Sequence, residues 1–154
     1  MSAQDDIRNL LCLYCEMIDA GDVDGLAHLF ADATIVGQDG TRIARGRDEV
    51  RNMYGSGNRR ERIGGQGRRT KHITTNVFVE IDEASDTAVA RSYWVLLVST
   101  SPEEPIRPVL AGRYHDRFTR VDGVWRFAER VYLVDLTGSE SGALLSGVTP
   151  SQTS

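Results

Sequence analysis

The first twenty residues have the hydrophobic spacing of one amphipathic helix. Apolar side chains recur every three or four positions, at Ile7, Leu10, Leu11, Tyr14 and Ile18. Ser2 with Asp5 three residues later is a capping-box pattern, and Gly21 is a typical C-terminal stop. Asp22 can then cap a short second helix that carries Leu26, Leu29 and Phe30. The sequence therefore predicts two consecutive helices at its start.

The remainder of the chain has mostly β-type patterns. Short strand-like segments at Ala33–Val36 and Thr41–Ala44 precede a third helix that opens at Gly46. β-branched and aromatic residues then predict four long strands, at Thr70–Asp82, Thr87–Thr100, Ile106–Val121 and Val124–Leu136. Asp122-Gly123 between the last two is a strong hairpin signal. We expect an α+β fold in which a curved antiparallel sheet wraps over the helices.

Composition narrows the class of protein. A chain of 154 residues with 40% hydrophobic and 26% charged residues is typical of one globular domain, here 1–138, followed by a loose tail, 139–154. The net charge of -4 argues against nucleic acid and anionic membranes as partners. The acidic N-terminus lacks the apolar region of a secretory signal, and no apolar run is long enough to span a bilayer. We expect a cytoplasmic protein.

Polar residues on the first helix are candidates for chemistry. Cys12, Cys15 and Asp19 lie within about 40° of one another at the border of the apolar face. We interpret the two cysteines as small core residues, because no second Cys/His pair completes a metal site. Asp19 either extends the apolar face into a cavity or is exposed near the helix end. Tyr14 is either a core aromatic or a hydrogen-bond donor in a site.

His72 opens a polar row on the first long strand. If no bulge intervenes, one face of this strand carries His72, Thr74, Asn76 and Phe78. This row is either the floor of a polar pocket or the wet face of an edge strand. His28 and His115 are expected to be exposed, so His72 is the histidine that remains for chemistry.

At this point the motifs resemble the SnoaL-like branch of the nuclear-transport-factor-2-like superfamily. They are Tyr14-x4-Asp19-Ala20-Gly21-Asp22, Leu29-Phe30-Ala31-Asp32-Ala33, Thr70-x-His72-x3-Asn76, Gly112-Arg113-Tyr114-His115-Asp116-Arg117-Phe118 and Asp122-Gly123-Val124-Trp125-Arg126-Phe127. The resemblance covers about residues 5–136 and implies a cone-shaped, cystatin-like fold. It does not fix the activity, because the superfamily holds dehydratases, ketosteroid isomerases, polyketide cyclases, dehydrochlorinases, dioxygenase β subunits and non-catalytic modules.

Within this branch, the motifs resemble the scytalone dehydratase and bile-acid dehydratase type. The resemblance implies a helix-borne Asp19 hydrogen-bonded to a strand-borne His72, with Tyr14 beside them and Arg130 in the pocket. The chain lacks two scytalone-type features. Gly112-Arg113 stands where a second pocket histidine is expected, and the position expected for a pocket tyrosine falls near Gly37.

These groups together could move protons without a cofactor. Asp19 would orient His72 as general base, and Tyr14 would donate to a developing oxyanion. Arg130 would neutralise an anionic or carbonyl end of the substrate, unless it is a surface charge. Asn76, Tyr93 and Tyr114 are candidate pocket walls or ordinary structural residues. We expect a lyase or isomerase acting on a small hydroxylated, carbonyl-bearing cyclic or aromatic metabolite. The alternative is a non-catalytic ligand-binding or assembly module, such as a ring-hydroxylating dioxygenase β-subunit-like protein.

Two further segments suggest contacts. The strand Thr87–Thr100 is apolar on both faces, which predicts a homodimer that packs sheet against sheet. The segment 58–71 holds six basic residues and one acid, and is either an anion-recognising lid or a solvated loop.

Overall fold

The computed structural model describes residues 1–56, 70–99 and 101–138. These residues form three helices: α1 (Ala3–Ala20), α2 (Val23–Leu29) and α3 (Gly46–Gly55). The strands are β1 (Thr34–Val36), β2 (Arg42–Arg45), β3 (Thr70–Asp82), β4 (Thr87–Val98), β5 (Arg107–Val121) and β6 (Val124–Thr137). They form one sheet of order β2-β1-β6-β5-β4-β3, in which only the β1–β6 pair is parallel. The expected α+β fold is confirmed.

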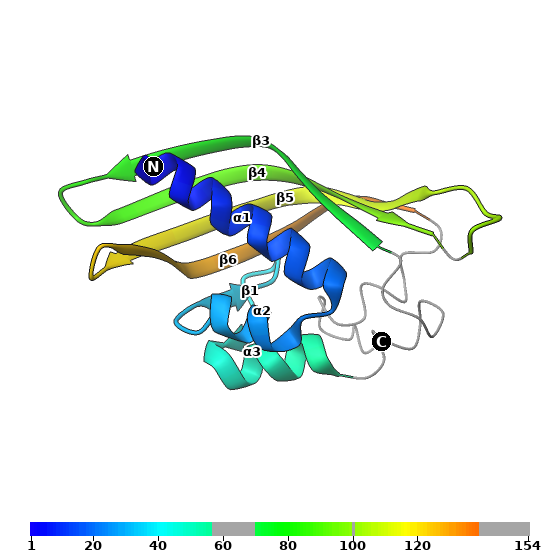
Figure 1. The fold of residues 1–154 in the computed structure, drawn as a ribbon, viewed down its shortest axis with the longest axis horizontal. Helices are drawn as coiled ribbons and strands as arrows, with labels where there is room; N and C mark the ends of the chain where they lie inside the picture. Colours follow the sequence, from blue (N-terminus) through cyan, green and yellow to red (C-terminus); the bar gives the residue numbers. More distant parts are fainter. Residues whose placement is uncertain (57–69, 100, 139–154) are drawn as a thin grey trace.

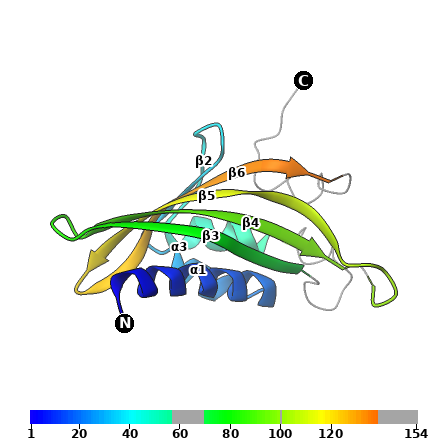
Figure 2. The same cartoon turned by 90° about the horizontal axis from the view of Figure 1, so that it is seen from above.

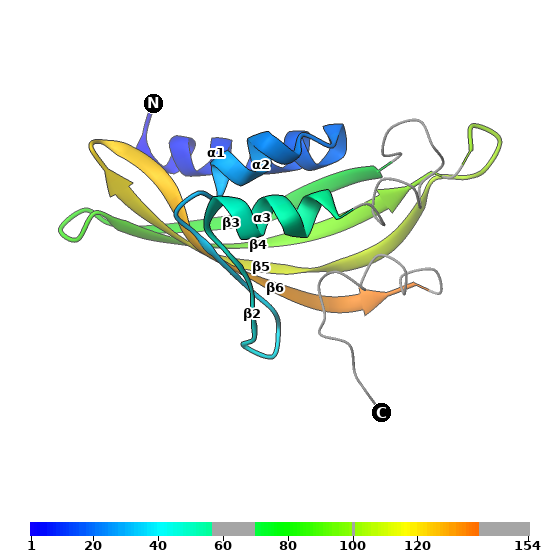
Figure 3. The same ribbon diagram turned by 90° about the horizontal axis from the view of Figure 1, so that it is seen from below.

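The helices lie on one face of a long, curved sheet (Figure 1). Helix α1 runs over this face and contacts β3 and β6, while α2 and α3 pack against each other near β1 and β2. Views turned by 90° show the helices on one side of the four long strands (Figures 2 and 3). We call the helix-covered side the inner face and the opposite side the outer face.

Local signals set the ends of the first two helices. The Ser2 hydroxyl accepts from the Asp5 backbone N–H, and the Asp5 carboxylate accepts from the Ser2 backbone N–H at 3.2 Å, which completes the predicted capping box. Gly21 ends α1 in the left-handed region with φ 71°. The Asp22 carboxylate caps α2 by accepting from the Gly25 N–H at 2.8 Å.

A bulge divides β3 into two halves with different alternation. The register with β4 shifts between Thr75 and Phe78, and Asn76 has φ 53°. Before the shift, His72 is on the inner face; after it, Val79 is buried in the core and Phe78 is 51% exposed. The expectation that the row from His72 to Phe78 shares one face is therefore wrong, because one extra residue reverses the side-chain direction.

The core lies between the inner face and the helices. Strand β4 shows the alternation clearly, with Ala88, Ala90, Trp94, Leu96 and Val98 buried. Its outer-face residues Val89 and Tyr93 are exposed. Within the described ranges, no helix is both long and apolar enough to cross a membrane.

Candidate active site

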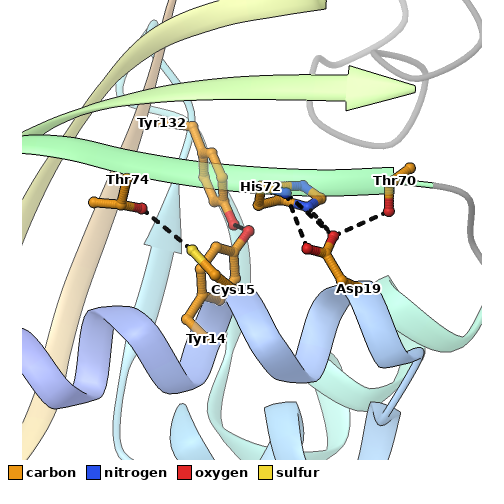
Figure 4. A network of polar contacts seen from close by, with 7 residues as sticks. All are labelled: Tyr14, Cys15, Asp19, Thr70, His72, Thr74 and Tyr132. Carbon is orange, nitrogen blue, oxygen red and sulfur yellow. Dashed lines mark hydrogen bonds and ion pairs between the residues drawn. The ribbon is translucent and has the colours of Figure 1, made fainter. Parts of the chain in front are cut away.

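Asp19 and His72 are in direct contact between α1 and β3 (Figure 4). The distance between His72 Nδ1 and Asp19 Oδ1 is 2.7 Å. The same carboxylate accepts from the His72 backbone N–H at 3.0 Å and from the Thr70 hydroxyl at 3.0 Å. Asp19 sits in the last turn of α1, and the start of β3 crosses above it, so the carboxylate is held by three donors from one strand. The structure thus brings together the two residues that the sequence singled out.

Electrostatics fix the roles of the two groups. Partial burial by itself raises the pKa of Asp19, but hydrogen bonds and charge from His72, together with Thr70, outweigh it and lower this pKa. An ionised carboxylate only accepts hydrogen bonds, so Nδ1 carries the proton and Nε2 has a free lone pair. Among the described residues, none hydrogen-bonds to Nε2 of His72. The His72 side chain keeps 12% of its surface exposed. This geometry can accept a proton at Nε2.

Tyr14 belongs to a chain of phenols that crosses the inner face. Its hydroxyl is 2.9 Å from that of Tyr132, which in turn is 2.6 Å from the hydroxyl of Tyr54 (Figure 4 shows the first contact). This chain of phenols connects α3, β6 and α1. At its α1 end, the centre of the Tyr14 ring is 6.2 Å from the centre of the His72 ring. Burial raises the pKa of Tyr14 and of Tyr54 well above the usual value, so both phenols stay protonated.

Tyr54 and Tyr132 were not predicted as part of a site. The spacing of Val50 and Tyr54 on α3 marks a buried helical row, which is a signal for burial but not for a hydroxyl partner. Their contacts join residues 78 and 118 positions apart, which no local pattern specifies.

Arg130 is fully buried and already paired. Its Nε and Nη2 donate to the two oxygens of Asp116 at 2.7 and 2.8 Å, and both side chains are 0% exposed. The guanidinium carbon lies 3.9 Å from the centre of the Tyr114 ring and 4.3 Å from that of Tyr14. Burial opposes the charge, but attraction and hydrogen bonds from Asp116 hold the pKa of Arg130 well above its usual range. Arg130 is therefore neither a surface charge nor a free cation.

Asp116 is a residue that the sequence reasoning missed. It alternates with Tyr114 and Phe118 on the inner face of β5, so the period-2 pattern places an acid in an aromatic row. Tyr114 itself is buried on this face, in edge contact with Tyr14 at 5.9 Å between ring centres. The Tyr114 side chain is thus on the same side of the sheet as the Asp19–His72 pair.

Two of the expected pocket walls lie elsewhere. Asn76 and Tyr93 line a hollow on the outer face, because the bulge turns Asn76 outward and the alternation of β4 directs Tyr93 away from the helices. Their assignment to the pocket of His72 is wrong.

The other predictions near the site have mixed outcomes. Cys12 is exposed and not a core residue, whereas Cys15 is half-buried with its Sγ 3.3 Å from the Thr74 hydroxyl. His28 and His115 are exposed as expected. No group of three or more metal-ligating side chains occurs within the described part of the chain. The basic segment falls almost entirely in 57–69, outside the described residues.

Comparisons with known proteins show the family of this chain. Residues 1–131 match the SnoaL-like domain, and the chain belongs to this family. A comparison with curated proteins gives no match.

Three solved structures illustrate the range of its structural relatives. Rv3472 from Mycobacterium tuberculosis, a function unknown protein, is 28% identical with a TM-score of 0.74, covering 93% of this chain and 86% of that one. A provisionally assigned scytalone dehydratase from Novosphingobium aromaticivorans is 24% identical with a TM-score of 0.68, covering 88% and 85%. The β subunit of a provisionally assigned aromatic-ring-hydroxylating dioxygenase from the same organism is 16% identical with a TM-score of 0.70, covering 92% and 94%. The last two likenesses establish the cystatin-like fold alone, so the family holds for this chain while its reaction does not follow from them.

Proposed function

We propose that this protein is a cofactor-independent lyase or isomerase that uses an Asp19–His72 dyad. The observation that carries the proposal is the 2.7 Å contact between His72 Nδ1 and an ionised Asp19, which leaves Nε2 free as a base. Three hydrogen bonds from β3 hold the Asp19 carboxylate at the end of α1. A carboxylate held in this way can orient the His72 imidazole.

The proposed reaction begins when Nε2 removes a proton from a carbon next to a carbonyl. Asp19 stabilises the imidazolium that forms, and the electron pair of the broken C–H bond moves onto the carbonyl oxygen as an enolate. The Tyr14 phenol, kept neutral by burial, is the proposed donor toward this oxygen. His72 then returns the proton to a leaving hydroxyl, which departs as water, or to another carbon, which completes an isomerisation. In a cyclisation, the enolate carbon instead bonds to a second carbonyl carbon of the substrate, and His72 gives the proton to the alkoxide that forms there.

The substrate class follows from these groups. A general base with one neutral donor suits a small hydroxylated ketone whose α proton is acidic. A row of aromatic rings starts beside the dyad, with Tyr14 next to His72, Tyr114 next to Tyr14 and Trp94 stacked on Tyr114. These rings favour a cyclic or aromatic metabolite.

A substrate screen with two matched histidine variants tests the proposal. We expect wild-type protein to turn over a member of a panel of hydroxylated ketones, steroids and polyketide intermediates. His72→Ala should lose nearly all of that turnover, whereas His28→Ala, at an exposed histidine of α2, should keep it. Retention of wild-type turnover by His72→Ala would overturn the mechanism, whereas no turnover of any panel member by wild-type protein would favour a non-catalytic module of the same fold.

A further inference from the structure

The indole of Trp94 has a buried N–H group without an acceptor. Its Nε1 is one of three buried side-chain polar atoms in the described ranges that have no hydrogen-bond partner there, together with Ser92 Oγ and Arg130 Nη1. The Arg130 guanidinium packs on aromatic rings whose π electrons compensate it, and a serine hydroxyl can rotate. The indole N–H can only donate, in a direction that its ring fixes. Such a buried donor calls for an acceptor from outside the protein chain.

Trp94 lies near the Asp19–His72 pair on the inner face. In the register of β3 and β4, Leu96 is opposite His72 and Trp94 is opposite Thr74. His72 and Trp94 are therefore diagonal neighbours on one face, about 7–8 Å apart. At this separation, one small cyclic compound can contact both side chains.

The inner face of β4 becomes more accessible toward the end that carries this pair. The exposure of its buried residues rises from 2% at Ala90 through 5% at Trp94 to 8% at Val98. The indole edge that bears Nε1 lies over Gly112, since a Cβ at this glycine would be 3.0 Å from Trp94 Cζ2. Because glycine has no side chain, β5 supplies neither a side-chain acceptor nor a cover for the N–H at this position.

We propose that the Trp94 N–H is a second hydrogen-bond donor of the Asp19–His72 site and binds a substrate oxygen other than the reacting carbonyl. This rests on the proposed function, in which Tyr14 donates to the reacting oxygen. A second donor at a fixed distance from the base orients the substrate ring, so that one acidic C–H faces Nε2 of His72. The substrate class narrows to cyclic ketones with a further carbonyl or hydroxyl oxygen, because a methyl group there would leave the buried N–H unpaired.

The indole signals in nuclear magnetic resonance spectra test this donor directly. The chain has two tryptophans, and Trp125, which packs under the Arg120 guanidinium, is the internal reference. In ¹⁵N-labelled protein, 6-hydroxy-1-tetralone should move the Trp94 indole proton downfield, because the N–H becomes hydrogen-bonded, and should leave the Trp125 signal in place. The matched probe 6-methyl-1-tetralone replaces the hydroxyl by a methyl group and should cause no such shift. Either Trp94→Phe or Trp125→Phe assigns the two signals.

The affinities of the same two probes give a second measurement. In calorimetry, wild-type protein should bind the hydroxyl probe about 5-fold more tightly than the methyl probe, as expected for one hydrogen bond between neutral groups. Trp94→Phe keeps an aromatic ring against Tyr114 but has no N–H, so this preference should disappear with unchanged circular dichroism. Trp125→Phe is the matched control and should keep the preference.

Three results would overturn the proposal. They are a Trp94 signal that stays in place with the hydroxyl probe, equal shifts with both probes, and a preference that survives in Trp94→Phe. A shift of both indole signals would report a change of the whole fold and would overturn it as well. Neither measurement requires turnover, so an intact Trp94 shift without any reaction would refute the proposed chemistry and not this donor.

Discussion

Two acid–base pairs lie on the inner face, with the same shortest contact and opposite surroundings. Asp19 meets His72 at 2.7 Å, and Asp116 meets Arg130 at 2.7 Å. The first pair keeps about a tenth of each side chain exposed and has a free ring nitrogen. The second is 0% exposed, and both carboxylate oxygens accept from the guanidinium. A similar contact can therefore belong to a group available for reaction or to one whose charge is already neutralised.

Position in the sheet explains the difference. His72 is on β3, an edge strand, and Asp19 is at the end of a helix, so part of the pair stays near solvent. Asp116 and Arg130 face each other on β5 and β6 in the middle of the sheet, beneath the aromatic rings of Tyr14 and Tyr114. Removal of both charges from water there is tolerable only because each compensates the other.

The largest expected effect is a loss of turnover, and it distinguishes the Asp19 carboxylate from that of Asp116. Asp19→Asn should keep the fold but lower turnover by up to about 10⁴-fold, because neutralising an orienting carboxylate costs that much in a Ser-His-Asp triad. Steady-state kinetics on the substrate found by the screen measure it. Asp32→Asn, at an exposed acid that pairs with Arg126, is the matched control and should leave the rate unchanged. A normal rate for Asp19→Asn would remove the distinction between the pairs.

Breaking the buried pair should instead cost stability. Arg130→Met leaves Asp116 charged and unpaired in the core, which should lower the free energy of unfolding by about 3–5 kcal/mol. Urea denaturation followed by circular dichroism measures this change. A double variant, Arg130→Met with Asp116→Leu, should recover much of the loss because no buried charge remains. A loss below about 1 kcal/mol for Arg130→Met would contradict a compensated buried pair.

Removing a hydroxyl from the phenol chain should have a smaller effect on turnover, and this effect should differ between Tyr14 and Tyr54. Tyr14→Phe removes the proposed oxyanion donor and should lower turnover on the order of 10²–10³-fold. Tyr54→Phe deletes a hydroxyl at the far end, and should cost roughly 0.5–1.5 kcal/mol of stability with a much smaller change in rate. Equal rate losses for the two variants would mean that Tyr14 acts only through the hydrogen-bonded chain.

The smallest effect concerns acid stability. Because the pKa of Asp19 is lowered in the folded protein, its contacts stabilise the fold above its unfolded pKa of about 3.9. That contribution should disappear as the pH falls through the lower, folded-state pKa. Urea titrations of wild-type protein and Asp19→Asn from about pH 6 downward should therefore converge in acid. A stability difference that grows as the pH falls would reverse the assigned direction of the shift.

The sequence by itself determined the elements and their class. Hydrophobic spacing and capping residues gave α1 and α2, and the predicted boundaries of the long strands agree with the structure to within two residues. These features depend on neighbours a few positions apart, so they are readable from the chain. The motif resemblance identified the SnoaL-like family and singled out Asp19 and His72, whose direct contact the structure shows.

Only the tertiary structure decided which residues share a face and which charges are compensated. A single extra residue at Asn76 reverses which face of the sheet the following side chains of β3 point to. No hydrophobic pattern in the sequence marks that bulge. The partner of Arg130 lies 14 positions away, across a strand pair whose register has its own shift near Phe118. The partners of Tyr132 come from two different helices. Such contacts arise because folding brings distant segments together, and burial then determines whether each polar group is paired or left free to react.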